Sequence, residues 1–411
     1  MATLANKRIL LGVTGGIAAY KSADLVRRLR EAGAETRVVM TDAATEFITE
    51  LTLQAVSGAP VHRRLLDTDA ESGMGHIALA RWADAIVVAP ASADFLARLA
   101  QGRGDDLLTT VCLASGAPLA VAPAMNQQMW RNAATQANVA TLRQRGMHIF
   151  GPGEGSQACG DVGPGRLLEP AEIAALTAGL FDTGVLDGLT VLVTAGPTWE
   201  ALDPVRGLTN KSSGKMGYAV AEAAAEAGAR VLLVSGPVKL PAPDRVETLR
   251  VVSALEMFDA VHARVTDADI FIGVAAVADY RPAQIASQKI KKSAERLTLE
   301  LMRNPDILAS VAALTPAPYT VGFAAETENL EAGARAKLET KGIDLIAANL
   351  VGGREGGFES DDNILTLVDR ESATQLPLAS KKRLARELIQ FIARKFHAKS
   401  CTQDSRRAHR Q

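Results

Sequence analysis

The sequence predicts an α/β protein of two domains, each with a mainly parallel sheet and helices on both faces. Apolar runs typical of β-strands alternate with segments whose apolar residues recur at helical spacing, beginning with 8–14 and 17–33. Glycines separate the two kinds of segment, and the same strand and glycine turn return at 189–200. We therefore place a first domain at 1–187 and a second at 188–396, followed by a disordered basic tail at 397–411.

Composition excludes several classes of function. The 411 residues carry 45 lysines and arginines against 46 aspartates and glutamates, so no overall field attracts nucleic acid or an acidic membrane surface. The sequence has no apolar run of about eighteen residues and no N-terminal signal peptide pattern. The three cysteines, at 112, 159 and 401, lack metal-ligand spacing and indicate a reducing compartment. We expect a cytoplasmic protein that binds neither nucleic acid nor membranes.

Small and polar residues follow the strands of the first domain and should share one edge of its sheet, because the carboxyl ends of parallel strands meet there. Amides and hydroxyls at a glycine turn before a helix form an anion site, so a phosphate or a flavin would fit. The turn lacks the G-x-G-x-x-G fingerprint and no acidic residue clearly ends the second strand, which argues against NAD. From these residues alone, a purely structural turn is an equal alternative. The candidates are Thr14, Gly15, Gly16, Thr41, Ala89, Pro90, Ala91 and Ser92.

A glycine-rich stretch at 151–166 carries Cys159 between two apolar blocks. Such a loop is easy to bend and costly to order, which suits a mobile flap that brings the cysteine into a site. The alternative is a surface linker with an incidental cysteine. His76 precedes a predicted helix and is either a base, a partner of a carboxylate or a structural cap. Asn126 is either a turn residue or a carboxamide aimed at a substrate.

The second domain carries lysines where an anion would bind. The segment SSGKMG places two hydroxyls, two glycines and a lysine before an alanine-rich helix, without the spacing of a Walker motif. KIKK at 289–292 is either a binding segment or solvated surface, as lysine clusters most often are. Lys337 and Lys341 are one helical turn apart and face either a triphosphate or water. Asp306 is a candidate helix cap.

Taken together, these segments resemble the bifunctional coenzyme A biosynthesis proteins, in which phosphopantothenoylcysteine decarboxylase is fused to phosphopantothenate-cysteine ligase. The resemblance runs from about residue 7 to residue 396. In the first half it is carried by GVTGGIAAYKS, GHI, APASAD, PAMNQQMW and GSQACGDVGPGR. In the second half it is carried by TAGPT, TNKSSGKMG, AAVADYRP, KIKK, NPDI and GFAAET. Each motif is weak alone, whereas the set is highly specific.

The resemblance implies a Rossmann-like, flavodoxin-like first domain with FMN on the strand-end edge. The essential histidine, asparagine and cysteine of the family fall on His76, Asn126 and Cys159. In that chemistry, FMN-dependent oxidation gives a thioaldehyde, which loses carbon dioxide readily because the electrons left behind delocalise onto sulfur. The resulting enethiol is reduced to 4'-phosphopantetheine with Cys159 as proton donor, a role that a mostly protonated thiol can fill. Asn126 would hold the substrate carboxylate, and His76 would assist the oxidation.

The resemblance implies that the second domain, also Rossmann-like, is the ligase. The carboxylate of 4'-phosphopantothenate attacks the α-phosphate of CTP, pyrophosphate leaves, and the amine of L-cysteine displaces CMP from the acyl cytidylate. Lysines and Mg²⁺ would neutralise the charge, although the sequence identifies no Mg²⁺ ligands. Asn210 would contact the acyl cytidylate, and Lys289 would serve the second half-reaction. The implied CTP site consists of Gly273, Val274, Ala275, Asp279, Lys289, Pro305, Asp306, Ile307, Leu308, Phe323, Lys337 and Lys341.

One residue departs from the family pattern, because Lys211 stands where we expect histidine and adds a positive charge. Two other functions stay open: a flavin-dependent decarboxylase or reductase of another substrate with a nucleotide-binding second domain, and a regulatory subunit that binds coenzyme A precursors or a phosphatase. The presence of Asn126 with Cys159, and of Asn210 with Lys289, argues against both. The resemblance also implies a homo-oligomer, in which trimers of flavin halves and dimers of ligase halves give a dodecamer.

Overall fold

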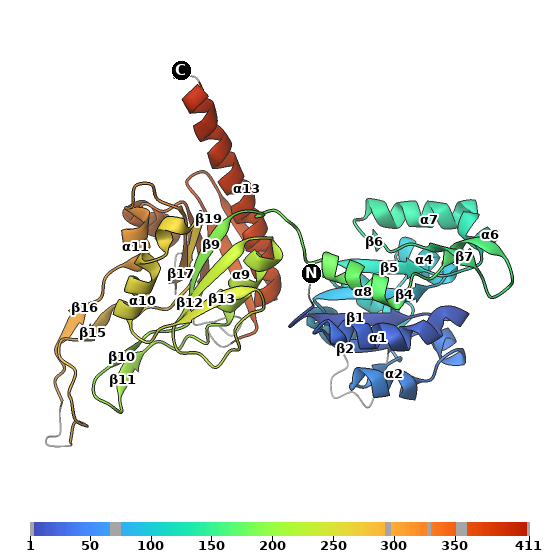
Figure 1. The fold of residues 1–411 in the computed structure, drawn as a ribbon, viewed down its shortest axis with the longest axis horizontal. Coiled ribbons are helices and arrows are strands. Elements are labelled where there is room, and N and C mark those ends of the chain that lie inside the picture. The colour runs from blue at the N-terminus through green and yellow to red at the C-terminus, as the bar shows by residue number, and fades with distance from the viewer. Residues whose placement is uncertain (1–3, 66–74, 292–296, 327–329, 351–359, 409–411) are drawn as a thin grey trace. The chain divides into compact units, whose positions relative to one another are not determined.

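The computed structural model describes residues 4–65, 75–291, 297–326, 330–350 and 360–408. The chain divides into two compact units, Met1–Asp182 and Thr183–Gln411 (Figure 1). This division falls close to the boundary expected at 187. Each unit has its own sheet and its own buried core, so each is described by itself.

The sheet of the first unit has six parallel strands in the order β3-β2-β1-β4-β5-β6. β3 is a two-residue strand at one edge, and without it the order is that of a five-stranded flavodoxin-like sheet. Ligands bind such sheets where the strand order reverses, which here is between β1 and β4. The predicted fold class is therefore confirmed. The strands are β1 (Arg8–Val13), β2 (Glu35–Met40), β3 (Val61–His62), β4 (Ala85–Ala91), β5 (Leu119–Pro123) and β6 (His148–Ile149).

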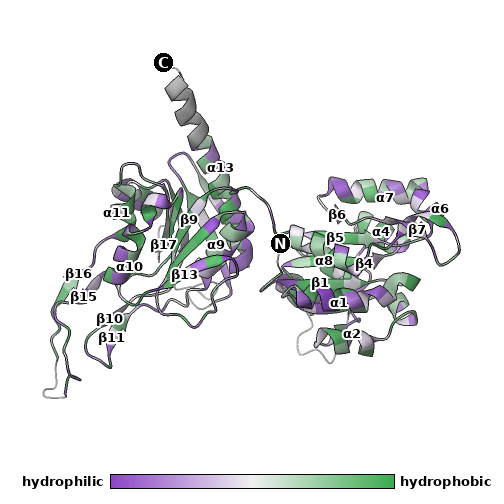
Figure 2. Cartoon of the chain, viewed as in Figure 1, coloured by the Kyte–Doolittle hydropathy of each residue, from purple (hydrophilic) through white to green (hydrophobic). Residues whose placement is uncertain are grey.

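Helices cover both faces of this sheet because successive strand residues point to opposite sides. Ile9 and Leu11 belong to one core with α1, α2 and α8, whereas Leu10 belongs to the other core with α3, α4, α5 and α7. Figure 2 shows hydrophilic and hydrophobic stretches alternating along α1 and α7. The helices are η1 (Ile17–Tyr20), α1 (Lys21–Glu31), η2 (Asp42–Glu46), α2 (Glu50–Ser57), α3 (Gly75–Trp82), α4 (Ala93–Ala100), α5 (Leu107–Ala114), α6 (Gln127–Arg131), α7 (Ala133–Gln144) and α8 (Pro170–Gly179).

The glycine-rich stretch at 151–166 forms a hairpin within the first unit. β7 (Gly153–Ser156) pairs antiparallel with β8 (Val162–Arg166), and Cys159 lies in the turn between them. The hairpin is held to the unit by Met125, whose N–H donates to Gly165 O at 2.9 Å. Position 165 requires glycine, because its φ is +131° and a Cβ atom there would lie 2.3 Å from Met125 O. The interpretation of this stretch as a linker between domains is therefore wrong.

The sheet of the second unit has eight strands in the order β13-β12-β9-β14-β17-β18-β19-β20. The first six are parallel, and the last two are antiparallel additions at one edge. The strand order reverses between β9 and β14, where a ligand site is expected. The strands are β9 (Thr190–Ala195), β12 (Arg230–Ser235), β13 (Val246–Arg250), β14 (Ile270–Gly273), β17 (Tyr319–Glu326), β18 (Leu345–Leu350), β19 (Asp362–Val368) and β20 (Ala373–Ser380).

Two small ribbons extend from this sheet, and helices cover its faces. Each ribbon is an antiparallel pair, one formed by β10 (Trp199–Ala201) and β11 (Gly207–Thr209), the other by β15 (Tyr280–Pro282) and β16 (Leu301–Arg303). Val191 and Val193 pack in one core with α9 and α13, whereas Leu192 packs in the other with α10 and α11. The helices are α9 (Lys215–Glu226), α10 (Ala254–His262), η3 (Val265–Asp267), α11 (Ile307–Ala312), α12 (Leu330–Lys341) and α13 (Lys381–Ala408).

The C-terminal helix is longer than expected. α13 continues to Ala408, through most of the stretch 397–411 for which we expected disorder. His397 Nε2 lies 2.9 Å from Val185 O, and Lys399 Nζ forms an ion pair with Asp344 at 2.5 Å. These contacts hold the extension, and its sequence contains neither proline nor glycine to stop the helix.

Candidate active sites

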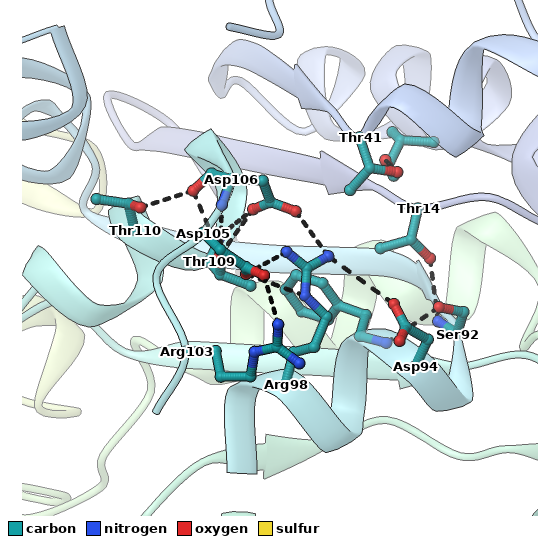
Figure 3. Close-up of polar contacts among 12 residues, drawn as sticks. Thr14, Thr41, Ser92, Asp94, Arg98, Arg103, Asp105, Asp106, Thr109 and Thr110 are labelled. Carbon is teal, nitrogen blue, oxygen red and sulfur yellow. Dashed lines mark hydrogen bonds and ion pairs between the residues drawn. The ribbon is translucent and has the colours of Figure 1, made fainter. Parts of the chain in front are cut away.

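The strand-end edge of the first unit brings together the predicted cofactor residues. Thr14 follows β1, Thr41 follows β2 and Ser92 follows β4, and the parallel register aligns the ends of these strands (Figure 3). Gly15 comes so close to η2 that a Cβ atom would lie 2.5 Å from Ala43 Cβ. Glycine is therefore required at this turn, which agrees with the predicted glycine turn before a helix.

Thr14 connects the two central strands at this edge. Its Oγ1 donates to Pro90 O at 2.8 Å and accepts from Ser92 N at 3.0 Å. The Thr14 side chain is buried, so both bonds form away from water. Ser92 also starts α4, because its Oγ accepts from Phe95 N at 3.2 Å. One hydroxyl therefore sets the geometry of the loop between β4 and α4.

The two alanines on either side of Pro90 support the same edge through their main chain. Ala89 O accepts from Ser22 Oγ at 2.9 Å, and Ala91 O accepts from Ala124 N at 3.1 Å. Both alanines are fully buried. They therefore shape the edge, and their carbonyls already have protein partners.

Replacing Thr14 with valine is expected to destabilise the flavin-free protein by about 1–3 kcal/mol, because Ser92 N loses its buried acceptor. The measurement is urea unfolding followed by circular dichroism. Thr41→Val is the matched control, since its hydroxyl makes only a long bond of 3.5 Å to Val13 O. Equal stabilities of the two variants would contradict the role given to Thr14.

A charge cluster that the sequence analysis missed lies beside this edge (Figure 3). The Arg98 guanidinium lies 3.8 Å from Asp94, 3.0 Å from Asp106, and its Nε donates to Asp105 at 3.2 Å. The hydrogen bond from Arg98 lowers the pKa of Asp105 and raises the pKa of Arg98. Asp106 also caps α5 through Thr109 N at 2.7 Å. The cluster thus fixes the loop between α4 and α5, a contact that spacing alone does not predict.

Asn126 and Cys159 lie together in the first unit. Asn126 Nδ2 is 3.2 Å from Cys159 Sγ and donates to Asp161 Oδ2 at 2.8 Å, while its Oδ1 accepts from Gln128 N at 2.8 Å and caps α6. Gln157 Oε1 accepts from Gln127 N at 3.0 Å and adds a second link between the hairpin and α6. Asn126 is therefore a turn residue through its oxygen and a donor to the hairpin through its nitrogen. The Cys159 side chain is exposed.

His76 lies on α3, in a different part of the first unit's sequence from this pair. It is the second residue of α3 and half-buried, rather than preceding the helix as expected. Within the described part of the chain, no hydrogen bond joins His76 to Asn126 or Cys159. The role of His76 in the oxidation step therefore rests on the family resemblance alone.

A pocket of about 190 Å³ lies at the carboxyl ends of β9, β14 and β17 in the second unit. Arg303 and Lys341 supply positive charge, and Asp279 and Asp306 supply negative charge. Asp306 caps α11 as predicted, through Ala309 N at 3.0 Å, and pairs with Lys341 at 3.1 Å. Burial raises the pKa of the Asp306 carboxyl, but the Ala309 hydrogen bond and Lys341 lower it more. The expected CTP residues that line this pocket are Gly273, Ala275, Asp279, Pro305, Asp306, Ile307, Leu308, Phe323 and Lys341.

Three expected CTP residues do not line the pocket. Val274 packs against the core on the α9 and α13 face, because it follows β14 with the opposite side-chain direction. Lys337 is exposed on α12, and Lys289 is exposed in the segment between β15 and β16. Arg303 and Asn304 line the pocket although the sequence analysis did not choose them. Their position directly before Pro305 was the only available indication.

Asn210 and the lysine segment are connected to the β10–β11 ribbon. Asn210 follows β11, and its Nδ2 donates to Ala276 O at 2.9 Å, close in sequence to the pocket residue Ala275. At the other end of the ribbon, Asp203 and Arg206 form an ion pair that contacts Ile290, the neighbour of Lys289. Lys292, the last lysine of KIKK, lies outside the described residues.

The described residues contain neither a cluster of metal-ligand side chains nor a helix that could span a membrane. No group of three or more histidine, cysteine, aspartate or glutamate side chains gathers there as metal ligands. None of the helices in the same ranges combines the length and apolar character needed to cross a membrane.

Comparison with known proteins covers both units. Residues 2–182 match the Flavoprotein family, and residues 186–396 match the DNA/pantothenate metabolism flavoprotein C-terminal domain family. The chain is 59% identical over 395 residues to the Coenzyme A biosynthesis bifunctional protein CoaBC of Vibrio vulnificus (strain YJ016), with 95% of this chain and 98% of that protein covered. The chain belongs to the bifunctional coenzyme A biosynthesis family.

Other members of this family and one solved structure extend the comparison. The chain is 54% identical over 403 residues to the CoaBC protein of Escherichia coli (strain K12), with 97% of this chain and 99% of that protein covered. It is 35% identical to the FMN binding protein AtHal3, over 42% of this chain and 94% of that chain, with a TM-score of 0.38. The two full-length relatives confirm, at the level of the family, the resemblance found in the sequence motifs.

Proposed function

We propose that the chain catalyses two reactions of coenzyme A biosynthesis, one in each unit. The second unit joins 4'-phosphopantothenate to L-cysteine with CTP and Mg²⁺, and the first unit decarboxylates the product to 4'-phosphopantetheine with FMN. Membership of the family supports both activities. The observation that carries the residue assignment is the contact between Asn126 and Cys159 on a hairpin of the flavoprotein unit.

The residues of the first unit suit decarboxylation. Bound FMN would supply the two-electron oxidation and its reversal, and the edge formed by Thr14, Thr41 and Ser92 leads into the N-terminus of α4, the kind of helix start that binds a phosphate. Asn126 Nδ2 donates a hydrogen bond to the carboxylate of Asp161. The proposed substrate also carries a carboxylate, which the same nitrogen could bind. Because Cys159 Sγ lies 3.2 Å from the same nitrogen, a substrate held there would have the thiol close to its reacting carbon. His76 assists the oxidation by the resemblance.

The residues of the second unit suit a reaction that needs charge neutralisation. The substrate carboxylate displaces pyrophosphate from the α-phosphate of CTP, and the cysteine amine then displaces CMP. Arg303 and Lys341 place positive charge in the strand-end pocket for the phosphates. Mg²⁺ is usually held by substrate phosphates with one or two carboxylates, so a dedicated protein cluster is not required. Asn210 contacts the acyl cytidylate, and Lys289 acts when cysteine attacks.

A visible absorption spectrum and a pyrophosphate assay test the two halves separately. We expect yellow protein that releases FMN on denaturation, in about one equivalent per chain, because only the first unit would hold a flavin. We also expect pyrophosphate release only when CTP, 4'-phosphopantothenate and Mg²⁺ are all present. Colourless protein that does not take up added FMN would remove the flavin site. Pyrophosphate release without 4'-phosphopantothenate would remove the ligase assignment.

By the same resemblance, we propose a cytoplasmic homo-oligomer in which flavin halves form trimers and ligase halves form dimers. Such an assembly closes as a dodecamer. Sedimentation equilibrium tests this directly, because the mass should be twelve times the 43.3 kDa of one chain. A monomeric or dimeric mass would contradict it.

A further inference from the structure

The turn of the β10–β11 ribbon contains a buried carboxylate whose hydrogen bonds leave the ribbon. The side chain of Asp203 is fully buried, and its Oδ1 accepts from Val205 N and Arg206 N, both at 2.8 Å. Its Oδ2 accepts from Arg206 NH2 at 2.6 Å and from Ile290 N at 3.1 Å. Burial raises the pKa of Asp203, but hydrogen bonds from Arg206 and the three amides lower it well below the usual range. The carboxylate is therefore charged and held from several directions.

Arg206 adds a second hydrogen bond to Ile290. Its NH2 group donates to Ile290 O at 2.7 Å, so Asp203 holds the N–H of Ile290 while Arg206 holds its carbonyl. A further bond, from Ala286 N to Leu202 O at 3.0 Å, attaches the preceding part of the segment to the ribbon. Ile290 lies between two exposed lysines, Lys289 and Lys291. The ion pair between Asp203 and Arg206 thus fixes both the N–H and the carbonyl of Ile290, the residue next to Lys289.

The same ribbon leads to the pocket. β11 runs from this turn to Asn210, whose side chain is bonded to Ala276 O at 2.9 Å beside the pocket residue Ala275. The ribbon therefore has the lysine segment at its turn and the strand-end pocket at its base. Asp203 thus fixes the main chain beside Lys289 at the turn, while Asn210 lies beside the pocket at the base.

We infer that Asp203 is a positioning residue for Lys289, acting through Arg206 and the main chain of Ile290. The inference rests on the proposed role of Lys289 in the second half-reaction. Since the hydrogen bonds of Asp203 described above go to Val205, Arg206 and Ile290, none of which lines the pocket, its loss should spare the first half-reaction. Misplacement of a reacting group by about 1 Å can cost on the order of 100-fold in rate.

Asp203→Asn in the full chain tests the inference, because asparagine keeps the volume and loses the charge that holds Arg206. We expect acyl cytidylate formation within about twofold of the parent and its transfer to cysteine slowed roughly 10- to 100-fold. In a Lys289→Gln background, Asp203→Asn should cause no further loss, because both changes act through one side chain. Equal losses in both half-reactions, or losses that multiply in the double variant, would overturn the inference.

Limited trypsin digestion gives a readout that does not depend on activity. Asp203→Asn should speed cleavage after Lys289 and Lys291, because Ile290 loses its anchors, and should leave cleavage after the exposed Lys239 unchanged. Asp244→Asn is the matched control, since Asp244 is exposed in the same unit, and it should match the parent in both assays. Unchanged cleavage after Lys289 would also overturn the inference. If Lys289→Gln alone made product normally, the proposed role of Lys289 would fail instead, whatever the digestion showed.

Discussion

Cys159→Ser is expected to release carbon dioxide while forming almost no 4'-phosphopantetheine. In the proposed mechanism, decarboxylation needs the oxidised substrate and the Asn126 site, both of which the variant keeps. The proposed reduction of the enethiol takes its proton from Cys159, and a serine hydroxyl is a far weaker acid than a thiol. General acids contribute about 10²- to 10⁴-fold, so formation of the reduced product should fall by that factor.

Mass spectrometry of the products, with carbon dioxide counted in parallel, separates the two steps. The expected product lacks two hydrogens relative to 4'-phosphopantetheine. Val162→Ala is the control, because Val162 lies on the same hairpin with an exposed side chain. Full turnover by Cys159→Ser would remove the proton-donor role, and loss of carbon dioxide release as well would indicate a collapsed hairpin.

Lys289→Gln is expected to accumulate acyl cytidylate and to form little ligation product. Lys289 lies outside the strand-end pocket, so Arg303 and Lys341, which line the pocket and which we propose bind the CTP phosphates, remain in place. Pyrophosphate release in a single turnover should therefore stay within about twofold, while ligation falls on the order of 10²-fold or more, as for other lost electrostatic groups.

Rapid quenching followed by chromatography would measure the acyl cytidylate directly. Lys239→Gln is the control, because Lys239 is an exposed lysine of the same unit. Unimpaired product formation by Lys289→Gln, or equal loss of pyrophosphate release, would refute the assignment of this lysine to the second step.

The fold was predictable because short stretches of sequence determine its elements. Buried parallel strands appear as short apolar runs, and the helices between them show apolar residues at helical spacing and end at glycines. Both sheets and the alignment of Thr14 with Ser92 follow from that alternation. The β7–β8 hairpin was not predictable, since GEGS and VGPGR contain none of the alternation of a strand. The bond from Met125 to Gly165 attaches this hairpin to the rest of the unit, and sequence spacing does not reveal it.

The sites were predictable only where their residues follow strands. The pocket lining at Pro305 and Asp306 was found through motifs, whereas Arg303 was missed because arginines near turns are common on surfaces. The bond between Asp203 and Ile290 joins positions 87 residues apart, so no local pattern contains it. The helix beyond 397 was missed because contacts with Val185 and Asp344, rather than its own polar sequence, hold it.

The double use of Asn126 has a consequence for how this position can vary in a gene. An asparagine codon becomes an aspartate codon by a single base change, and the new side chain would still cap α6 through an oxygen. Its second oxygen would however take the place of the nitrogen that now lies 2.8 Å from Asp161. Two carboxylates at that distance repel, so either one of them takes up a proton or the hairpin bearing Cys159 moves away from α6, and both outcomes cost stability. Asn126→Asp needs only one base change and looks conservative, but the added negative charge makes it unfavourable at this position.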